Sequence, residues 1–210
     1  MFKKALLPDT LRAIKLVSKI PTVSNAYLAG GTGLSLHLGH RISVDLDFFS
    51  KEKFREESLS LELSKIPKYK EEGKSWQTVW GLIGETKFSL FYYKYPLLKD
   101  PENFEGIKVT SKEDIAAMKI NAIEDRGTRR DFIDLYFLTK EFSMDQMLKF
   151  YDDKYKHLDD HLYSIIRAFT YFEDAEQEVM PKMLEDADWG KIKGFFVSES
   201  ERLWKKVIRK

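Results

Sequence analysis

The sequence predicts an α+β protein in which strands come first and helices follow. Its 210 residues suit a single domain or a domain with a helical appendage, and 43% hydrophobic residues are enough to form a core. The β-rich runs lie before residue 111, and the periodic segments after it have helical spacing. That order is typical of α+β architecture and indicates an α/β core at 1–110, followed by a helical region at 111–210.

The first part should contain the strands together with three helices. Apolar residues at helical spacing predict the helices, which Pro21, Gly39 and Pro67 end. Alternating or continuous apolar runs predict the strands, and the pair Gly84-Glu85 divides two of them into a hairpin. The helices are expected at 6–19, 32–38 and 51–66, and the strands at 26–29, 42–49, 76–83, 86–95 and, as an edge strand, 106–110.

The second part should be helical throughout. Its periodic segments predict helices at 111–126, 128–140, 144–154, 159–172 and 192–209. The stretch 173–188 is acidic and contains Pro181, so we expect a loop there.

Composition excludes several classes of protein. The 35 basic residues against 34 acidic ones give a formal charge of +1, so nucleic-acid binding would need a local basic patch. No cysteine is present, which excludes disulfides, thiolate zinc sites and cysteine nucleophiles. Early charges argue against a signal peptide, and no apolar run approaches the roughly 20 residues of a spanning helix. We expect a cytoplasmic protein with no membrane partner.

The segment YLAGGTGLSLHLGHRISVDLDFF at 27–49 carries the strongest chemical signal. Gly30 and Gly31 end a strand and let backbone approach a ligand, and Thr32 is expected to cap the next helix, whose N-terminus favours phosphate. Asp45 and Asp47 are two apart in the next strand, so both should point to one face. Two such carboxylates repel each other unless a cation lies between them, and Mg²⁺ prefers oxygen ligands and substrate phosphates. The pattern predicts a metal site at the aspartates and a nucleotide phosphate site at the glycines and Thr32.

Lys119 lies on an apolar helix face. Its neighbours three and four residues away are Ile115, Ala116, Ala122 and Ile123. An ammonium there is unfavourable unless it reaches water or meets an anion. Beside the carboxylate motif we interpret Lys119 as a ligand of nucleotide phosphate, with Arg126 on the same side of the helix. A change of Lys119 to methionine should then leave stability equal or higher.

Asp131 permits two interpretations. Thr128 and Asp131 have the spacing of a capping box, so Asp131 can simply close the start of its helix. Asp134 shares its face, and few other polar groups lie nearby. The hairpin aromatics, Trp76 and Trp80 among them, are interpreted as core and sheet surface rather than as a base-stacking platform.

Two motifs resemble a known family. Gly-Gly-Thr, a short helix and Asp-Leu-Asp-Phe at 45–48 look like the first motif of DNA polymerase β-like nucleotidyltransferases. With His40 and Arg41 upstream, the string resembles the AbiEii/AbiGii toxin family, and 114–138 is similar to that family's second signature of lysine, arginine and a later aspartate pair. The resemblance implies a small mixed nucleotidyltransferase-type sheet with flanking helices, an α-helical C-terminal half, and a site in the cleft between them. It also makes Asp131 a catalytic candidate beside Asp45 and Asp47.

The implied function is Mg²⁺-dependent transfer of a nucleotide from an NTP to an acceptor, with tRNA 3′ ends as the candidate. The resemblance also implies a toxin of a bacterial toxin–antitoxin or phage-defence system, with a cognate antitoxin protein as partner. One departure is visible: such enzymes usually carry a third carboxylate on a neighbouring strand, where this chain has Ser89. The alternatives are therefore a weak or inactive NTP-binding module, or a nucleotidyltransferase that modifies proteins.

Overall fold

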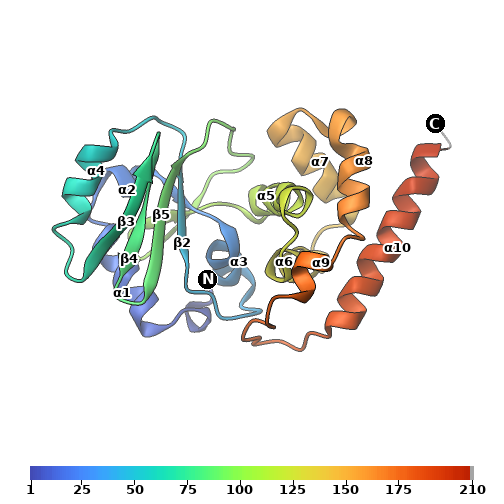
Figure 1. Cartoon of the computed structure of the whole chain (residues 1–210), viewed down its shortest axis with the longest axis horizontal. Helices are drawn as coiled ribbons and strands as arrows, with labels where there is room; N and C mark the ends of the chain where they lie inside the picture. Colours follow the sequence, from blue (N-terminus) through green and yellow to red (C-terminus); the bar gives the residue numbers. More distant parts are fainter. Residues whose placement is uncertain (209–210) are drawn as a thin grey trace. The chain divides into compact units, whose positions relative to one another are not determined.

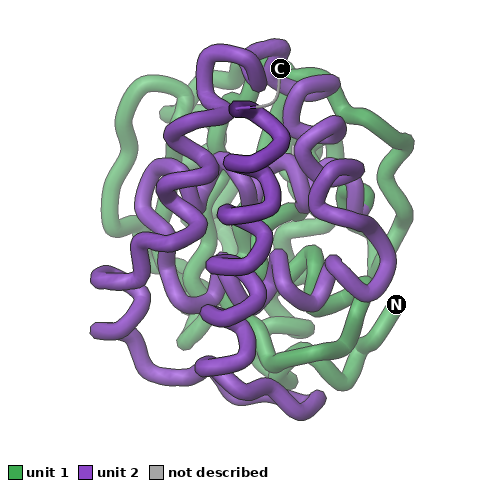
Figure 2. Tube along the Cα trace, turned by 90° about the vertical axis from the view of Figure 1, so that its right-hand side faces the viewer, with its two compact units in different colours: residues 1–111 green, residues 112–210 purple. Residues whose placement is uncertain are grey.

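The computed structural model describes residues 1–208, and these divide into two compact units (Figure 2). Unit 1 comprises Met1–Ser111 and holds every described strand, whereas unit 2 begins at Lys112 and is built from helices. The α+β order that the sequence predicts is confirmed. The further division into functional regions at 1–110 and 111–210 stays a prediction.

Unit 1 is built on one mixed sheet. Along the described chain its strands are β1 (Tyr27–Leu28), β2 (Leu46–Ser50), β3 (Tyr69–Ser75), β4 (Thr78–Ile83), β5 (Thr86–Tyr92), β6 (Glu102–Phe104) and β7 (Ile107–Val109). In space their order is β3-β4-β5-β2-β1-β7-β6. The central strand β2 runs parallel to β5 and antiparallel to β1, and β1 runs parallel to β7. β5 and β1 therefore lie on opposite sides of β2.

One face of this sheet forms the core of unit 1. The flanking helices are η1 (Lys3–Ala5), α1 (Pro8–Val17), α2 (Pro21–Asn25), α3 (Gly30–Leu38) and α4 (Glu56–Leu63). Alternate strand residues such as Phe48, Phe88 and Leu90 are buried in one hydrophobic cluster with residues of α1 and α4. Figure 1 shows these two helices beside the sheet. The intervening positions, Asp47 and Ser89 among them, are only partly buried. The polar residues of the candidate site thus project from the face opposite the core.

Several predicted boundaries in unit 1 are wrong. The strand expected at 42–49 begins only at Leu46, because the segment before it bonds elsewhere: the N–H of Ser43 donates to the carbonyl of Ala5. The helix expected at 51–66 is α4 and starts at Glu56. The strand expected at the edge, 106–110, is β7, which lies inside the sheet because β6 covers it.

Unit 2 consists of helices among its described residues. They are α5 (Lys112–Asp125), α6 (Arg129–Leu138), α7 (Met144–Tyr155), α8 (Leu158–Ala168), α9 (Glu173–Glu176) and α10 (Trp189–Ile208). The loop expected at 173–188 contains the short helix α9, and the helix expected at 192–209 starts earlier, at Trp189; residue 209 lies outside the described residues. Within 1–208, every helix is too short or too polar to cross a membrane.

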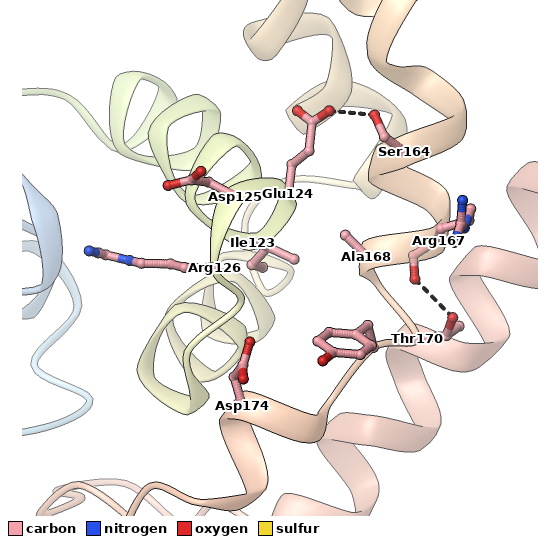
Figure 3. A pocket seen from close by; sticks show the side chains of 10 residues that line it. Ile123, Glu124, Asp125, Arg126, Ser164, Arg167, Ala168, Thr170 and Asp174 are labelled. Carbon is pink, nitrogen blue, oxygen red and sulfur yellow. Dashed lines mark hydrogen bonds between the residues drawn. The ribbon is translucent and has the colours of Figure 1, made fainter.

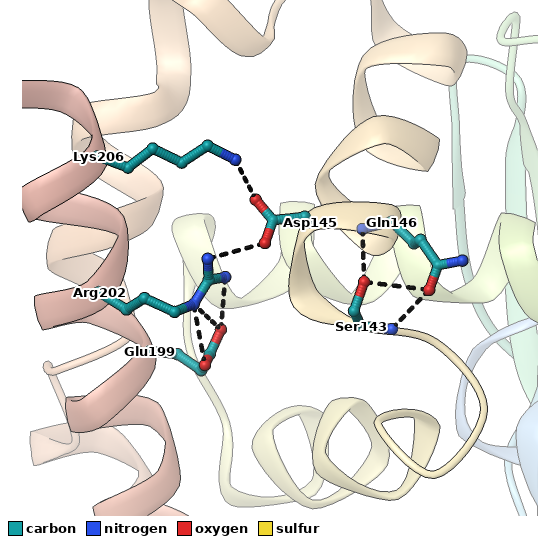
Figure 4. Close-up of polar contacts among 6 residues, drawn as sticks. All are labelled: Ser143, Asp145, Gln146, Glu199, Arg202 and Lys206. Atoms are coloured by element: carbon teal, nitrogen blue, oxygen red, sulfur yellow. Dashed lines mark hydrogen bonds and ion pairs between the residues drawn. The ribbon is translucent and has the colours of Figure 1, made fainter. Parts of the chain in front are cut away.

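Charged contacts hold α10 to the first turn of α7 (Figure 4). Ser143 caps α7 with a complete capping box to Gln146. Asp145, in the first turn, accepts from Lys206 at 2.6 Å and pairs with Arg202 at 2.8 Å. These exposed pairs add to the packing of α10, whose Ile192, Phe196 and Leu203 are buried.

Candidate active site

Asp47 lies between the start of α3 and strand β5. Its Oδ1 accepts a hydrogen bond of 2.6 Å from the hydroxyl of Ser89, the residue directly opposite on β5. On the other side, a Cβ built on Gly30 would lie 3.2 Å from Asp47 Oδ2, and Gly30 has a φ of +60°. Both the left-handed conformation and the close approach favour glycine here. The neutral Ser89 thus occupies the neighbouring-strand position at which the sequence departs from the polymerase β-like pattern.

Thr32 does not cap α3, contrary to the expectation. The N-cap is Ala29, without a side-chain cap, and Thr32 lies inside the first turn with its side chain buried. Its Oγ1 lies 2.5 Å from the main-chain oxygen of Asp45 and 2.8 Å from Ser43 Oγ. The hydroxyl therefore fixes the extended segment that carries Asp45, which precedes β2 and is not part of the strand.

In unit 2, Lys119 forms ion pairs with two aspartates. Its Nζ lies 2.7 Å from Asp131 Oδ1 and 2.7 Å from Asp134 Oδ2, and all three side chains are at least nine-tenths buried. The apolar helix face around the lysine does require an anion, as the sequence argument held, but the chain itself provides it. These ion pairs argue against the expectation that methionine would leave stability equal or higher, because the change would remove the nearest cation from two buried carboxylates.

Asp131 takes part in both a cap and an ion pair. Thr128 is the N-cap of α6 and accepts from the N–H of Asp131, while its hydroxyl donates to Asp131 Oδ2 at 2.5 Å. Burial raises the pKa of Asp131, but Lys119, Thr128 and Arg126 together outweigh it and hold the pKa below the ordinary 3.8. Arg126 Nε is 3.7 Å from Asp131, although its own side chain is 66% exposed.

Comparison with known proteins identifies the family. Residues 16–97 and 92–207 match the family described as nucleotidyl transferase AbiEii toxin, type IV toxin–antitoxin system. An uncharacterized protein of Aquifex aeolicus strain VF5 is 36% identical over 201 residues, which cover 92% of this chain and 95% of that protein. The chain belongs to the AbiEii family. The nucleotidyltransferase resemblance that the two sequence motifs indicate is confirmed.

Solved structures share the fold of this AbiEii protein. JHP933 from Helicobacter pylori gives a TM-score of 0.56 at 21% identity, with 95% of this chain and 91% of that chain covered. MenT4, a nucleotidyltransferase toxin from Mycobacterium tuberculosis H37Rv, gives a TM-score of 0.51 at 12% identity, with 93% and 84% covered. At these identities the likeness shows the fold alone, a mixed sheet with helices and a helical C-terminal half.

The oxygen donors in unit 1 of the AbiEii protein suit a hard divalent cation. Among residues 1–208, no group of three or more His, Cys, Asp or Glu side chains is arranged to hold a metal. Mg²⁺ binds proteins through one or two carboxylates and completes its shell with water and substrate phosphates. Asp45 and Asp47 supply that number of carboxylates, and both are partly exposed. The residues fit an ion that arrives with a nucleotide better than a preformed metal cage.

Sequence reasoning missed a second buried ion pair. Lys154 of α7 lies 2.7 Å from Asp114 of α5, and both side chains are fully buried. Asp114 stands at the start of the second AbiEii-like motif, but the sequence does not reveal its partner, which is 40 residues away. The pair ties α5, which carries Lys119, to α7.

A pocket of about 450 Å³ lies in unit 2 between α5 and α8 (Figure 3). Its charged lining residues are Glu124, Asp125, Arg126, Arg167 and Asp174. In Figure 3 the side chain of Arg126 extends away from the other lining residues, whereas Glu124 bonds to Ser164 across the pocket. Three of these five charged groups are acidic and two are basic, so the charge of the lining alone does not mark the pocket as a phosphate site.

Proposed function

We propose that this AbiEii protein transfers a nucleotide from an NTP to the 3′ end of an RNA, with tRNA as the acceptor. In this reaction an acceptor hydroxyl oxygen attacks the α-phosphorus and forms a new phosphodiester bond. The bond from the α-phosphorus to the oxygen that bridges to the β-phosphorus breaks, pyrophosphate leaves with its electrons, and the hydroxyl proton passes to water. The observation that carries the proposal is the Asp47 carboxylate, which is fixed between Gly30 at the helix start and Ser89. Family membership supports the reaction class, and the fold shared with the toxin MenT4 agrees with it.

The residues of unit 1 bind and orient the triphosphate. The first N–H groups of α3 point out of the helix, and its positive dipole end favours an anion, so we assign Gly30 and Gly31 to the phosphates. Thr32 contributes indirectly, because its hydroxyl holds the segment of Asp45. Asp45 and Asp47 would hold Mg²⁺, which when bound neutralises phosphate charge and helps the leaving group depart.

The residues of unit 2 have an electrostatic role in this proposal. Asp131 is held ionised at a pKa below its ordinary value, so it is a weak proton acceptor and an effective partner for cations. Lys119 is already neutralised by two aspartates, and we assign it to positioning Asp131 rather than to direct phosphate binding. Arg126 is largely exposed, and its assignment to a nucleotide phosphate stays a prediction from the family resemblance.

The biological setting follows from the family. We infer a toxin with a cognate antitoxin, acting in the cytoplasm, where NTPs and tRNA are found, and serving in phage defence. The family described as a type IV toxin–antitoxin system supports the toxin role. The antitoxin is proposed on the same ground.

The first test is transfer of label from each NTP to total tRNA in the presence of Mg²⁺. Asp47→Asn and Asp45→Asn should each lower the rate by about 100-fold or more, the scale for loss of one group that stabilises transition-state charge. Asp100→Asn, an exposed aspartate of unit 1, is the matched control and should keep the wild-type rate. Full transfer by Asp47→Asn would refute the metal assignment, and label on protein instead of RNA would favour the protein-modifying alternative.

Ser89 favours one second candidate, an NTP-binding module without turnover. A hydroxyl bonded to Asp47 cannot take a proton from an acceptor as a third carboxylate could. Under this alternative, NTP with Mg²⁺ raises the melting temperature while no labelled RNA forms. Labelled RNA from the wild type, abolished by Asp47→Asn, would exclude it.

A further inference from the structure

One row of side chains crosses the partly exposed face of the sheet in unit 1. Asp47 on β2 lies opposite Ser89 on β5, Ser89 lies opposite Trp80 on β4, and Trp80 lies opposite Gly73 on β3. Directly paired residues project from the same face of a sheet. The indole of Trp80 therefore stands in the same row as the Asp47 carboxylate, two strands away, which is roughly 10 Å at the usual strand spacing.

Trp80 has a flat support beneath it and an accessible surface. A Cβ on Gly73 would lie 2.3 Å from Cζ2 of Trp80, so the ring lies across the bare backbone of β3. The indole is still 37% exposed, in contrast to the core residue Phe88 of the same hairpin, which is 1% exposed. A large ring that is packed on one side and open on another is what a stacking contact needs.

The geometry around Asp47 distinguishes the two sides of the reaction. Its Oδ2 faces Gly30, at the start of α3 on the β1 side, and its Oδ1 faces Ser89 on the β5 side. In phosphoryl transfer the attacking and leaving oxygens lie roughly in line on opposite sides of phosphorus. With the phosphates at the helix start, pyrophosphate leaves on the α3 side and the acceptor hydroxyl approaches from the side of β5 and β4, where Trp80 lies.

We propose that Trp80, which the sequence pattern alone assigns to core or sheet surface, is a stacking platform for the terminal nucleobase of the RNA acceptor. The inference rests on the proposed transfer to RNA and adds a residue that selects the acceptor. A base offers a planar π-face to the indole, which a serine or threonine acceptor does not, so RNA is favoured over such a protein acceptor. Lys87, exposed on the same face two residues before Ser89, supplies a cation for a neighbouring backbone phosphate.

The test measures KM for a tRNA acceptor and KM for the NTP separately. Trp80→Ala should raise KM for RNA about tenfold, within the range for loss of one base–aromatic stack, and leave KM for NTP within twofold. Trp80→Phe should retain most of the wild-type RNA affinity. Trp76→Ala is the matched control: Trp76 lies at the turn of the β3–β4 hairpin, is 71% exposed and stands outside the row, so both KM values should stay unchanged.

A binding measurement keeps this inference separate from the proposed function. Addition of a short oligoribonucleotide should quench part of the tryptophan fluorescence of the wild type, and that part should be missing in Trp80→Phe. If quenching is seen without any transfer, the stacking site stands and the proposed function fails. Unchanged KM values in Trp80→Ala, a rise confined to KM for NTP, or equal quenching in Trp80→Phe would each overturn the inference.

Discussion

Lys119 is buried between Asp131 and Asp134, and its ammonium lies 2.7 Å from an oxygen of each. A single lysine therefore balances two buried carboxylates, with the largely exposed Arg126 nearby. Desolvation makes each of these charges costly on its own, so the cluster is stable only as a whole. This has direct consequences for substitutions.

Changing Lys119→Met should destabilise the protein by about 3–5 kcal/mol, the scale for removal of one partner from a buried ion pair. Denaturant unfolding of both proteins at neutral pH measures it. The triple variant that also carries Asp131→Asn and Asp134→Asn removes the carboxylate charges left unpaired and should recover part of the loss. Equal stability of wild type and Lys119→Met would mean that the ion pairs do not form in solution.

The pKa of Asp131 makes stability depend on acid. Because the folded state holds this pKa below 3.8, the carboxylate stabilises the fold above that value, and the stabilisation is lost as the pH falls through the lower folded pKa. Below about pH 4, the free energy of unfolding of Asp131→Asn should therefore decrease less steeply with falling pH than that of the wild type. Urea unfolding from pH 7 to pH 2 checks this, with the exposed Asp160→Asn as control. If the stability of Asp131→Asn fell below pH 4 as steeply as that of the wild type, this prediction would be contradicted.

At the scale of elements, α3 positions the segment before β2. The buried hydroxyl of Thr32 reaches the carbonyl of Asp45, and Gly30 lies against Asp47. The helix start and the two carboxylates thus form one local unit within unit 1. A substitution at the start of α3 should therefore alter the positions of Asp45 and Asp47.

Thr32→Val keeps the shape of this side chain but removes its hydroxyl. It should lower stability by about 1 kcal/mol, because the partly buried carbonyl of Asp45 loses a hydrogen-bond partner, and it should weaken Mg²⁺-dependent NTP binding. Thr32→Ser retains the hydroxyl and should behave nearly as the wild type. Calorimetry with NTP and Mg²⁺ on both variants checks this, and equal affinities would separate Thr32 from the site.

Periodicity predicted most elements, because their apolar faces are buried. The hairpin of β4 and β5 and the helices α5 to α8 match the expected ranges within a few residues. Strand β3 was missed because its sequence, YKEEGKS, is charged and largely exposed, as suits an edge strand. The start of β2 was misplaced because alternation continues through 42–45, where hydrogen bonds to η1 and α3 replace the ladder.

The site was predictable in part for the same kind of reason. Local residue spacing predicted Asp45 and Asp47 as site residues, and it predicted that Lys119 would need an anion nearby. The bond from Ser89 to Asp47 depends on strand pairing over 42 residues, and the partner of Lys154 is 40 residues away. Only the tertiary fold brings such groups together, so local sequence patterns do not predict these contacts.

For the whole molecule, the net charge determines whether RNA binding can rely on a general electrostatic attraction or needs local contacts. A formal charge of +1 over 210 residues gives no general attraction for a polyanion. The contacts proposed here are few: a stacked base at Trp80, a phosphate at Lys87, and the nucleotide itself. Binding of RNA should then depend on local contacts rather than on the overall field.

This predicts a weak dependence of RNA affinity on salt. For a single strand each neutralised phosphate contributes a slope of about −0.7 in log K against log salt, so the one phosphate contact proposed, at Lys87, gives a slope of about −0.7. Titration of the oligoribonucleotide from 50 to 200 mM salt should show it, and Lys87→Ala should make the slope shallower by roughly one phosphate contact, about 0.7. Trp80→Ala should weaken binding at every salt concentration and leave the slope unchanged, because stacking releases no counterions. A slope near −5 in the wild type would instead require a concentrated basic surface. It would contradict the proposal that the RNA acceptor is held mainly by the row of residues from Asp47 to Trp80.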